Sequence, residues 1–248
     1  MPWRMIPFQT FPAAMNMGLD DCLGERVVTG ESPPTVRLYG WHPSAVSIGR
    51  FQSLNDEVDV KECSRRGVEI VRRRTGGGAV YHDKNGEVTY SVIAPEDALP
   101  NDIGACYRKV CGCLIDAISS LGVKAEFRPV NDILIEGKKV SGSALTRRGG
   151  AFLQHGTLLL SVDSRLMFSL LKVSRAKASD KDIASAGERV TALDRHIDAS
   201  RQRVLTALEG SFRTELQCKR GALTDLEIGR AEEIAAERFG SWEWTALR

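Results

Sequence analysis

Apolar residues recur at helical spacing in two long segments of the chain. After Pro12, which suits the first turn of a helix, Met15, Leu19, Leu23 and Val27 follow one another every four residues. Further along, apolar residues at helical spacing mark a longer segment that ends before Gly122: Ile103, Tyr107, Val110, Leu114, Ile118 and Leu121. Each pattern predicts an amphipathic helix with one face in the core.

Short runs of apolar and β-branched residues between turn residues predict the strands. They occupy residues 35–39, 45–48, 68–71, 79–82, 88–94, 125–127, 132–135, 140–144 and 151–161. The turn signal Asp83-Lys84-Asn85-Gly86 predicts that 79–82 and 88–94 pair as a hairpin.

The remaining segments complete the prediction of the fold. Residues 56–66 predict a short polar helix, residues 174–187 lack periodicity and predict a mobile loop, and helical signals return from Val190. Strands therefore dominate the first two thirds of the chain and helices its end. This order predicts an α+β fold, a mixed β-sheet flanked by helices, rather than a regular βαβ alternation. Because no linker or repeat interrupts the patterns, we expect one domain over residues 1–248.

Composition and charge narrow the class of protein. Of the 248 residues, 42% are hydrophobic and 27% are charged, as in ordinary globular chains. The net charge of +2 is too small to indicate a nucleic-acid binder. No apolar run suits a signal peptide or a membrane span, so we expect a cytoplasmic protein with no nucleic-acid or membrane partner.

The six cysteines indicate a reducing environment rather than a disulfide framework. None of them forms a Cys-x-x-Cys pair, and a chain of this length does not need disulfides to bury a core. Cys106 and Cys113 lie seven residues apart and share a face of the second predicted helix. We interpret them as buried apolar residues, because a zinc site needs four converging ligands.

The first candidate for chemistry is a glycine-rich segment. Residues 72–78 read Arg-Arg-Arg-Thr-Gly-Gly-Gly, directly after a predicted strand. Glycines permit positive φ, so successive amides can turn inward and bind an anion, and arginines at the mouth would add charge. Neither a Walker lysine nor a helix pattern follows, which excludes a P-loop and a Rossmann fingerprint. A tight turn beside a basic strand end remains the alternative.

Two further segments carry polar residues beside small ones. In residues 131–144, Lys139 precedes a strand with Gly142 and Ala144, which leave space for a ligand along the strand. An exposed hairpin with solvated lysines is the alternative. In residues 153–160, His155 precedes Gly156 and Thr157. Because no nucleophile adjoins His155 or His82, we favour structural roles for both histidines over general-base roles.

Together, these segments resemble the lipoate–protein ligase family, within the superfamily of biotin and lipoate ligase catalytic domains. The matching stretches are 73, 75–83, 131–132, 138–144 and 155–159, with weaker matches at 15–17, 47–52 and 241–244. The resemblance covers nearly the whole chain and implies a class II synthetase-like fold. It implies a two-step reaction, in which lipoate and ATP give lipoyl-AMP and a lysine of a carrier domain then takes the lipoyl group.

The resemblance also implies site residues. Lys139 is the expected catalytic residue, Asp132 the expected Mg²⁺ ligand, and Gly49, Tyr39 and Trp41 are candidates for the lipoate groove. ATP and lipoyl-AMP are expected to contact Arg73, Thr75, Gly76, Gly77, Gly78, Ala79, Val80, Tyr81, Asn131, Asp132, Lys139, Gly156 and Thr157. The expected partner is a lipoyl domain of the E2 component of 2-oxoacid dehydrogenases, or the H protein of glycine cleavage.

One departure from the family concerns the end of the chain. Many members continue after the segment that resembles 241–244 into a small accessory domain required for adenylation. This chain ends shortly after that segment. A separate small accessory subunit, a transfer-only activity and an unaided ligase are the three alternatives.

The nearest rival function is an octanoyl or lipoyl transferase of the same fold. Such enzymes hold the acyl group on a cysteine, which lies either in an insertion before the lysine strand or just before the His-Gly pair. Here residues 127–132 and 149–154 contain neither an insertion nor a cysteine. A biotin ligase and a nucleic-acid module, the latter based on the clusters 72–74 and 147–148, are the more distant rivals.

Overall fold

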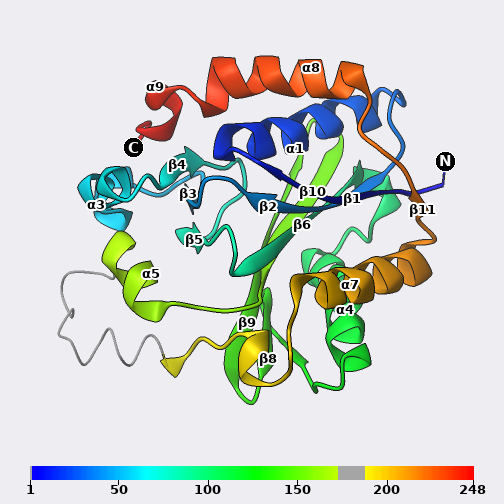
Figure 1. The fold of residues 1–248 in the computed structure, drawn as a ribbon. Helices are drawn as coiled ribbons and strands as arrows, with labels where there is room; N and C mark the ends of the chain where they lie inside the picture. The colour runs from blue at the N-terminus through cyan, green and yellow to red at the C-terminus, as the bar shows by residue number, and fades with distance from the viewer. Residues whose placement is uncertain (1, 173–187) are drawn as a thin grey trace.

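The centre of the molecule is an eight-stranded mixed β-sheet (Figure 1). The computed structural model describes residues 2–172 and 188–248. Strands β11, β1 and β2 run parallel, and β2, β6, β10, β9, β8 and β7 follow in antiparallel pairs. In sheet order the strands are β11 (Lys219–Arg220), β1 (Arg4–Phe11), β2 (Thr35–Trp41), β6 (Glu87–Pro95), β10 (Ala151–Leu159), β9 (Lys138–Arg148), β8 (Asp132–Ile135) and β7 (Glu126–Arg128).

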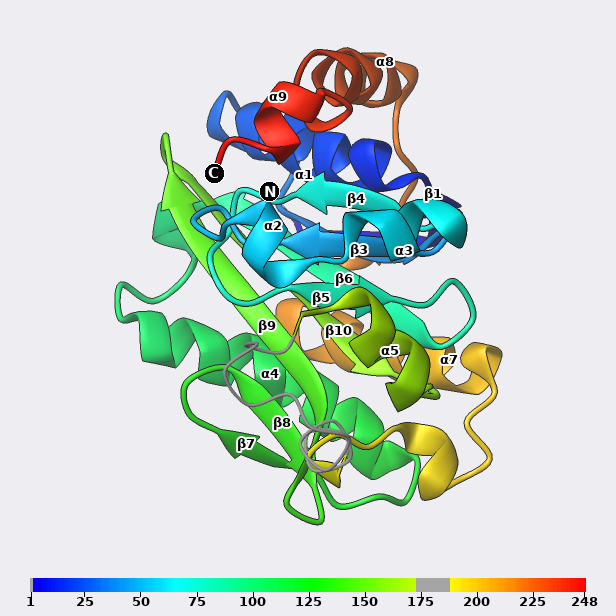
Figure 2. The same ribbon diagram turned by 90° about the vertical axis from the view of Figure 1, so that its left-hand side faces the viewer.

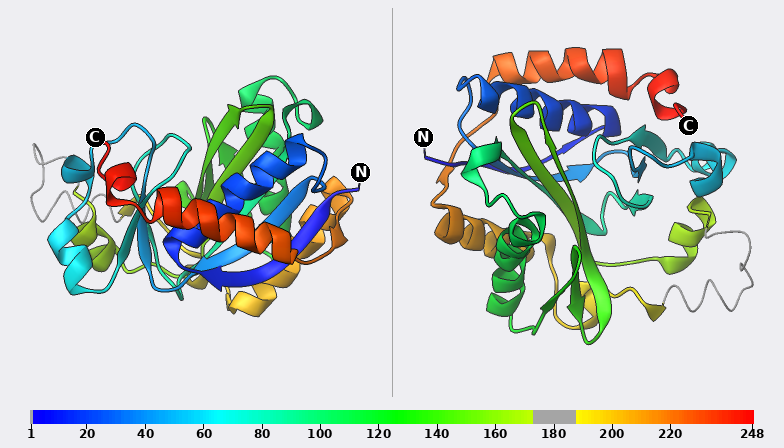
Figure 3. Two further views of the ribbon diagram at one scale, coloured as in Figure 1. Left: turned by 90° about the horizontal axis from the view of Figure 1, so that it is seen from above. Right: turned by 180° about the vertical axis from the view of Figure 1, so that it is seen from behind.

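Two pairs of helices cover the faces of this sheet (Figures 1 and 3). Helices α1 (Ala13–Val28) and α8 (Asp225–Ile234) pack together on one face, and α4 (Ile103–Ser120) and α7 (Arg201–Leu216) on the other. The apolar stripe of α4, with Val110 and Leu114 fully buried, packs into the largest hydrophobic cluster. The predicted α+β fold with a mixed sheet flanked by helices is therefore confirmed.

A second, three-stranded sheet lies beside the first and makes the other wall of the site (Figure 2). Its order is β4 (Glu69–Arg72), β3 (Ala45–Ile48) and β5 (Val80–His82). Near it lie the short helices α2 (Leu54–Glu57), α3 (Val60–Arg65) and α5 (Ser164–Leu170). The remaining short elements are η1 (Glu96–Ala98), η3 (Leu193–Arg195), η4 (Ala235–Phe239) and α9 (Trp242–Thr245).

The predicted hairpin of 79–82 and 88–94 is wrong in its pairing, although both segments are strands. Strand β5 pairs with β3 in the small sheet, whereas β6 lies between β2 and β10 in the large one. Residues 87–94 of β6 are all buried, so the strand has neighbours on both edges and both faces. The chain therefore crosses from one sheet to the other at the predicted turn.

Two other differences have local causes. Strand β1 was not predicted, because Pro7 and polar residues interrupt its short apolar pattern. The predicted helix 56–66 is two short helices, and the Asp59 side chain caps the second one. The predicted loop 174–187 lies outside the described residues.

All six cysteines are unpaired and buried, as expected for Cys106 and Cys113. Among the residues described, no helix is both long and apolar enough to cross a membrane.

Helices α1 and α8 approach so closely that Gly18 has no space for a side chain. A Cβ atom there would lie 2.5 Å from the carbonyl oxygen of Ala231. We predict that Gly18→Ala lowers the free energy of unfolding by about 1–3 kcal/mol, because the helices must separate. Gly112→Ala in α4 is the matched control, since a Cβ atom there meets nothing within 4 Å. The control should gain up to about 1 kcal/mol of helix propensity. Urea denaturation of both variants tests the contrast, which equal stabilities would contradict.

Candidate active site

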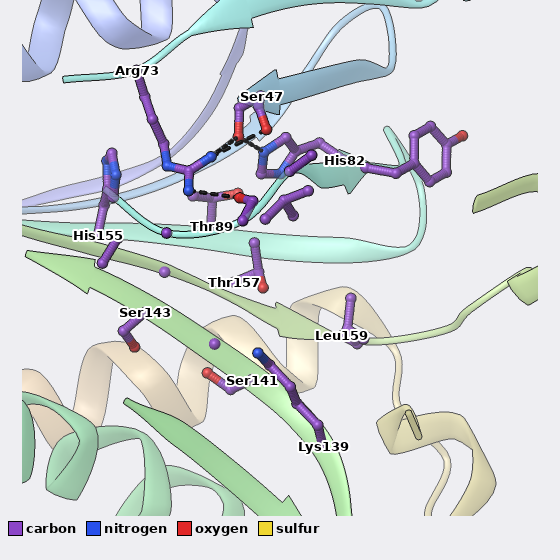
Figure 4. Close-up of a pocket in the computed structure, with 18 of the residues that line it drawn as sticks. Ser47, Arg73, His82, Thr89, Lys139, Ser141, Ser143, His155, Thr157 and Leu159 are labelled. Atoms are coloured by element: carbon purple, nitrogen blue, oxygen red, sulfur yellow. Dashed lines mark hydrogen bonds between the residues drawn. The ribbon is translucent and has the colours of Figure 1, made fainter. Parts of the chain in front are cut away.

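A cavity of about 330 Å³ lies between the two sheets, and the three predicted motifs meet in it (Figure 4). Figure 4 shows Arg73, Ser47 and His82 gathered on one wall, with Lys139 reaching in from β9. The predicted site residues that line the cavity are Tyr39, Trp41, Arg73, Gly77, Gly78, Ala79, Val80, Tyr81, Asn131, Lys139, Gly156 and Thr157. Their binding roles stay predictions, but their convergence is a property of the structure.

Four predicted residues are not part of the cavity lining. Gly49 lies against the outer side of the glycine loop, where a Cβ atom would stand 2.1 Å from the carbonyl oxygen of Gly77. Thr75 is fully buried, and the carbonyl of Gly76 faces Arg73. Asp132 pairs with Lys139 instead. The structure therefore assigns Gly49 to close packing of the loop rather than to a groove.

In the glycine loop, residues 76–79, carbonyl groups are bonded to Arg73, whereas the amide groups are free of partners among residues 2–172 and 188–248. Gly77 has φ +91°, a conformation that favours glycine. Within the part of the chain that the structure describes, no acceptor is found for the amides of residues 76–79. Unpaired amides beside a cavity are what an anion site requires, and anion binding by the loop stays a prediction.

Lys139 lies at the edge of the cavity with its ammonium group held but accessible. Its Nζ is 2.7 Å from Oδ1 of Asp132, and 42% of its side chain is exposed. The side chain passes directly over Gly142, where a Cβ atom would lie 2.6 Å from Cε and 2.7 Å from Nζ. Gly142 thus creates the space that Lys139 occupies, which favours the site interpretation over a solvated hairpin.

Asn131 and Asp132 support the same edge. The Asn131 side-chain amide donates to the carbonyl of Ser143 on β9. Asp132 is the one predicted metal ligand, and its carboxylate already accepts from Lys139. Elsewhere in the described residues, no group of three His, Cys, Asp or Glu residues is placed to hold a metal ion. A single carboxylate suits a Mg²⁺ ion that is bound mainly by substrate phosphates.

Another part of the cavity lining is apolar and aromatic. Trp41 stacks on His82 with 4.0 Å between ring centroids and donates from Nε1 to Thr89. Tyr39 and Trp41 are almost fully buried, as expected of residues that would enclose an acyl tail. Met167 and Leu159 continue the apolar lining.

The three consecutive arginines hold the fold rather than adding charge at the mouth, contrary to the expectation. Arg72 is fully buried and donates to the carbonyls of Thr245 at the C-terminal end and of Gly49. Arg74 forms an ion pair with Asp21 of α1. Arg73 donates from all five of its N–H groups to protein oxygens, two of which are the carbonyls of Gly76 and Gly78.

Three buried polar residues that the sequence did not reveal join this part of the site. Asp20 of α1 accepts a bond from the ring of His155, and Glu87 of β6 from the ring of His82. Ser47 of β3 bonds both His82 and Arg73. Both histidines line the cavity and are parts of one hydrogen-bond network rather than of separate turns, and their structural role stays a prediction. Ser47 lies in the weak match 47–52 and Glu87 only five residues after His82, but no motif assigned either of them, or Asp20, a role in the site.

The chain belongs to the family of lipoate ligases and transferases. Residues 12–213 match the model of the lipoyl protein ligase A/B catalytic domain, so the chain is a member of that family. The predicted resemblance is thereby confirmed.

Two groups of similar proteins, named octanoyltransferase and lipoate-protein ligase, match nearly the whole chain. Octanoyltransferase LipM of Brevibacillus brevis is 34% identical, with 99% of each chain covered, and that of Kyrpidia tusciae is 35% identical, with 98% and 97% covered. A bi-partite lipoate protein ligase of Thermoplasma acidophilum, from a study that includes its E2 lipoyl domain, is 29% identical with a TM-score of 0.88. This match covers 100% of the present chain and 98% of the Thermoplasma chain. A lipoate-protein ligase A bound with ATP is 27% identical, with a TM-score of 0.86 and full coverage of both chains.

These names bear on the choice between ligase and transferase. The chain is an enzyme of the lipoate ligase and transferase family, but the names of the curated relatives favour the transferase alternative over the predicted ligase. The alignment with the Brevibacillus protein spans 275 positions against the 248 residues here. That relative therefore has at least 27 residues with no counterpart in this chain.

Burial of His155 predicts how stability depends on pH. Desolvation lowers the pKa of His155, opposed by the neighbouring Asp20 carboxylate. The unfolded chain then takes up this proton first, below about pH 6.5, so stability is present above that value and lost as the pH falls. We predict that the free energy of unfolding decreases from pH 7.5 to 5.5, by at most about 1.4 kcal/mol per pH unit for this proton. Urea titrations of wild type and His155→Gln test this. The same slope in both proteins would contradict the assignment.

Proposed function

We propose that this chain attaches lipoate, or an eight-carbon relative, to a lysine of a lipoyl carrier domain by way of an acyl adenylate. The observation that carries the proposal is a shared cavity, which is lined by Lys139, by Gly77 and Gly78 of the glycine loop, and by aromatic side chains. A cavity of about 330 Å³ lies in the range of small-ligand sites. No nucleophile of the protein is needed on this route.

The chemistry follows from where the positive groups lie. A carboxylate oxygen of the acid attacks the α-phosphorus of ATP, and pyrophosphate leaves. Lys139 and the loop amides would stabilise the negative charge that collects at the acid and the phosphate. Asn131 and Asp132 would line the nucleotide side, where a Mg²⁺ ion held by Asp132 would neutralise phosphate charge. The carrier lysine then attacks the acyl carbonyl, and AMP leaves.

The solved relatives support the choice of ligands and partner. One relative was determined with ATP, and another Thermoplasma acidophilum relative, 27% identical with a TM-score of 0.83, with bound lipoic acid. The bi-partite ligase was studied with an E2 lipoyl domain. By the same reasoning we propose a lipoyl domain or an H protein as the acceptor and a separate accessory subunit for adenylation. Reduced thiols and the need for ATP suit the cytoplasm.

An octanoyltransferase is the second candidate, and the names of the curated relatives favour it. Transfer from an acyl thioester through a covalent intermediate requires a placed nucleophile. None of the six cysteines lines the cavity, and all are buried. Cys111 is 3.6 Å from the Ser143 hydroxyl, but desolvation raises the pKa of its thiol to about 11. The geometry therefore favours the adenylate route.

The two candidates differ in the acyl donor that they accept. We predict that the protein lipoylates a lipoyl domain from preformed lipoyl-AMP, and from lipoate with ATP and Mg²⁺ when any required accessory subunit is present. We predict no modification from an octanoyl thioester without ATP. Intact-mass spectrometry of the acceptor domain measures its modification from each acyl donor. Acyl transfer from the thioester that iodoacetamide abolishes would establish the transferase instead.

Lys139 should be indispensable on the adenylate route. We predict that Lys139→Ala lowers the rate of acyl-AMP formation at least about a hundredfold, because a preorganised cation is lost from the site of charge development. The matched control is Lys138→Ala, whose side chain is exposed on the same turn. Both variants should keep the wild-type melting temperature. Activity of Lys139→Ala equal to that of the control would remove Lys139 from the mechanism.

A further inference from the structure

We propose that two buried carboxylates, Asp20 and Glu87, position the glycine loop by fixing Arg73 through two matched hydrogen-bond relays. Each relay runs from a carboxylate through a histidine and a hydroxyl to the guanidinium group. The inference rests on the proposed function in one respect, that the loop binds the acyl phosphate. Asp20 and Glu87 would be positioning residues, since neither lines the cavity.

The first relay comes from α1. Oδ2 of Asp20 is 3.1 Å from Nδ1 of His155, and Nε2 of His155 is 2.7 Å from the Thr75 hydroxyl. Nε of Arg73 donates to the same hydroxyl over 3.1 Å. Asp20 is itself held by an ion pair of 2.6 Å with Arg37 and is 2% exposed.

The second relay comes from β6 and has the same order of groups. Oε1 of Glu87 is 2.8 Å from Nδ1 of His82, and Nε2 of His82 is 2.8 Å from the Ser47 hydroxyl. Nη1 of Arg73 donates to that hydroxyl over 3.2 Å (Figure 4). Glu87 is 1% exposed. Two separate parts of the fold thus reach the same guanidinium group.

The chemistry of the groups sets the direction of every bond. A guanidinium group only donates, so the hydroxyls of Thr75 and Ser47 accept from Arg73 and have their own protons to give. Nε2 of each histidine accepts that proton when the ring carries its own proton on Nδ1. That proton is donated to the carboxylate, which fixes the tautomer. A single arrangement of protons satisfies both relays.

The relays bind Nε and Nη1 of Arg73, so its Nη2 group remains to bind the loop. Its Nη2 donates to the carbonyl of Gly76 over 2.8 Å and to that of Gly78 over 2.7 Å. Gly77, between them, has the positive φ and packs on Gly49. The two relays hold the guanidinium, and the guanidinium holds the loop. Arg73 thereby fixes the backbone of the anion site and does not itself bind the anion.

Loss of one carboxylate tests this inference. In Glu87→Ala, Nδ1 of His82 loses its acceptor and the tautomer is no longer fixed, whereas Glu87→Gln keeps an acceptor oxygen. We expect Glu87→Ala to raise hydrogen–deuterium exchange of the peptide that covers residues 74–80. We also expect its Kd for a non-hydrolysable lipoyl-AMP analogue to rise between about tenfold and a hundredfold. Glu87→Gln should restore most of both. Asp20→Asn, which also keeps an acceptor, should behave like Glu87→Gln.

Glu227 provides the matched control. It is also 1% exposed, bonded to an arginine, Arg4, and absent from the cavity lining, but its other side-chain partners are Ser32 and Thr224 rather than a histidine of the relays. Glu227→Ala should lose stability and leave both exchange in 74–80 and analogue binding unchanged. If Glu87→Ala fails to fold, Ser47→Ala breaks the same relay at the hydroxyl and should give the same exchange result.

Wild-type exchange in 74–80 in whichever Glu87 or Ser47 variant folds would overturn the inference, as would an equal increase in Glu227→Ala. Failure of the proposed function gives a different result. In that case the exchange increases in Glu87→Ala as expected, but wild-type protein does not bind the analogue.

Discussion

The constraint on which this site depends is the burial of a charged guanidinium group. Arg73 is 5% exposed, and desolvation lowers its pKa to about 10, so the group stays charged at neutral pH. A buried charge is tolerable only when each donor has an acceptor, and all five of its N–H groups have one. Because these acceptors come from β3 and from the glycine loop, the charge forces the small sheet and the loop into one arrangement.

This arrangement divides the positive charges of the site between two functions. Arg72, Arg73 and Arg74 are bound to protein oxygens and fix the backbone. Lys139 remains partly exposed, with one carboxylate as its partner, on a strand that Gly142 clears for it. A flexible ammonium group can exchange Asp132 for a substrate carboxylate or phosphate more easily than a guanidinium group with five bonds can. The cation that stays accessible to a ligand and the cations that fix the backbone are thus different residues.

The sequence predicted the convergence of the motifs but not the groups that hold them together. Periodicity was sufficient for α1 and α4, since each has a continuous apolar stripe. It failed for β1, because Pro7 and polar residues interrupt the apolar pattern. It also failed for the partner of β5, because strand pairing depends on contacts distant in sequence. Glycines and Lys139 were visible as local motifs, whereas Asp20 and Glu87 look like ordinary polar residues of a helix and a strand. Only folding brings them to the histidines, so no spacing rule could assign them. For the same reason Gly49 was assigned to the groove when it supports the loop.

Ligase and transferase chemistry place opposite demands on the same cavity. A transferase needs a polarisable nucleophile with a low pKa at the acyl carbonyl, whereas an adenylating enzyme needs cations and amides around a phosphate. In this chain the thiols are buried and burial raises the pKa of Cys111, while Lys139 and residues 77–79 of the loop line the cavity. The LipM relatives share the fold and the curated name, yet the Brevibacillus protein also has residues that this chain lacks. Loss or gain of one segment that carries a nucleophile would be enough to move such a scaffold between the two reactions. The network around Arg73 holds the glycine loop whichever of the two reactions the cavity serves.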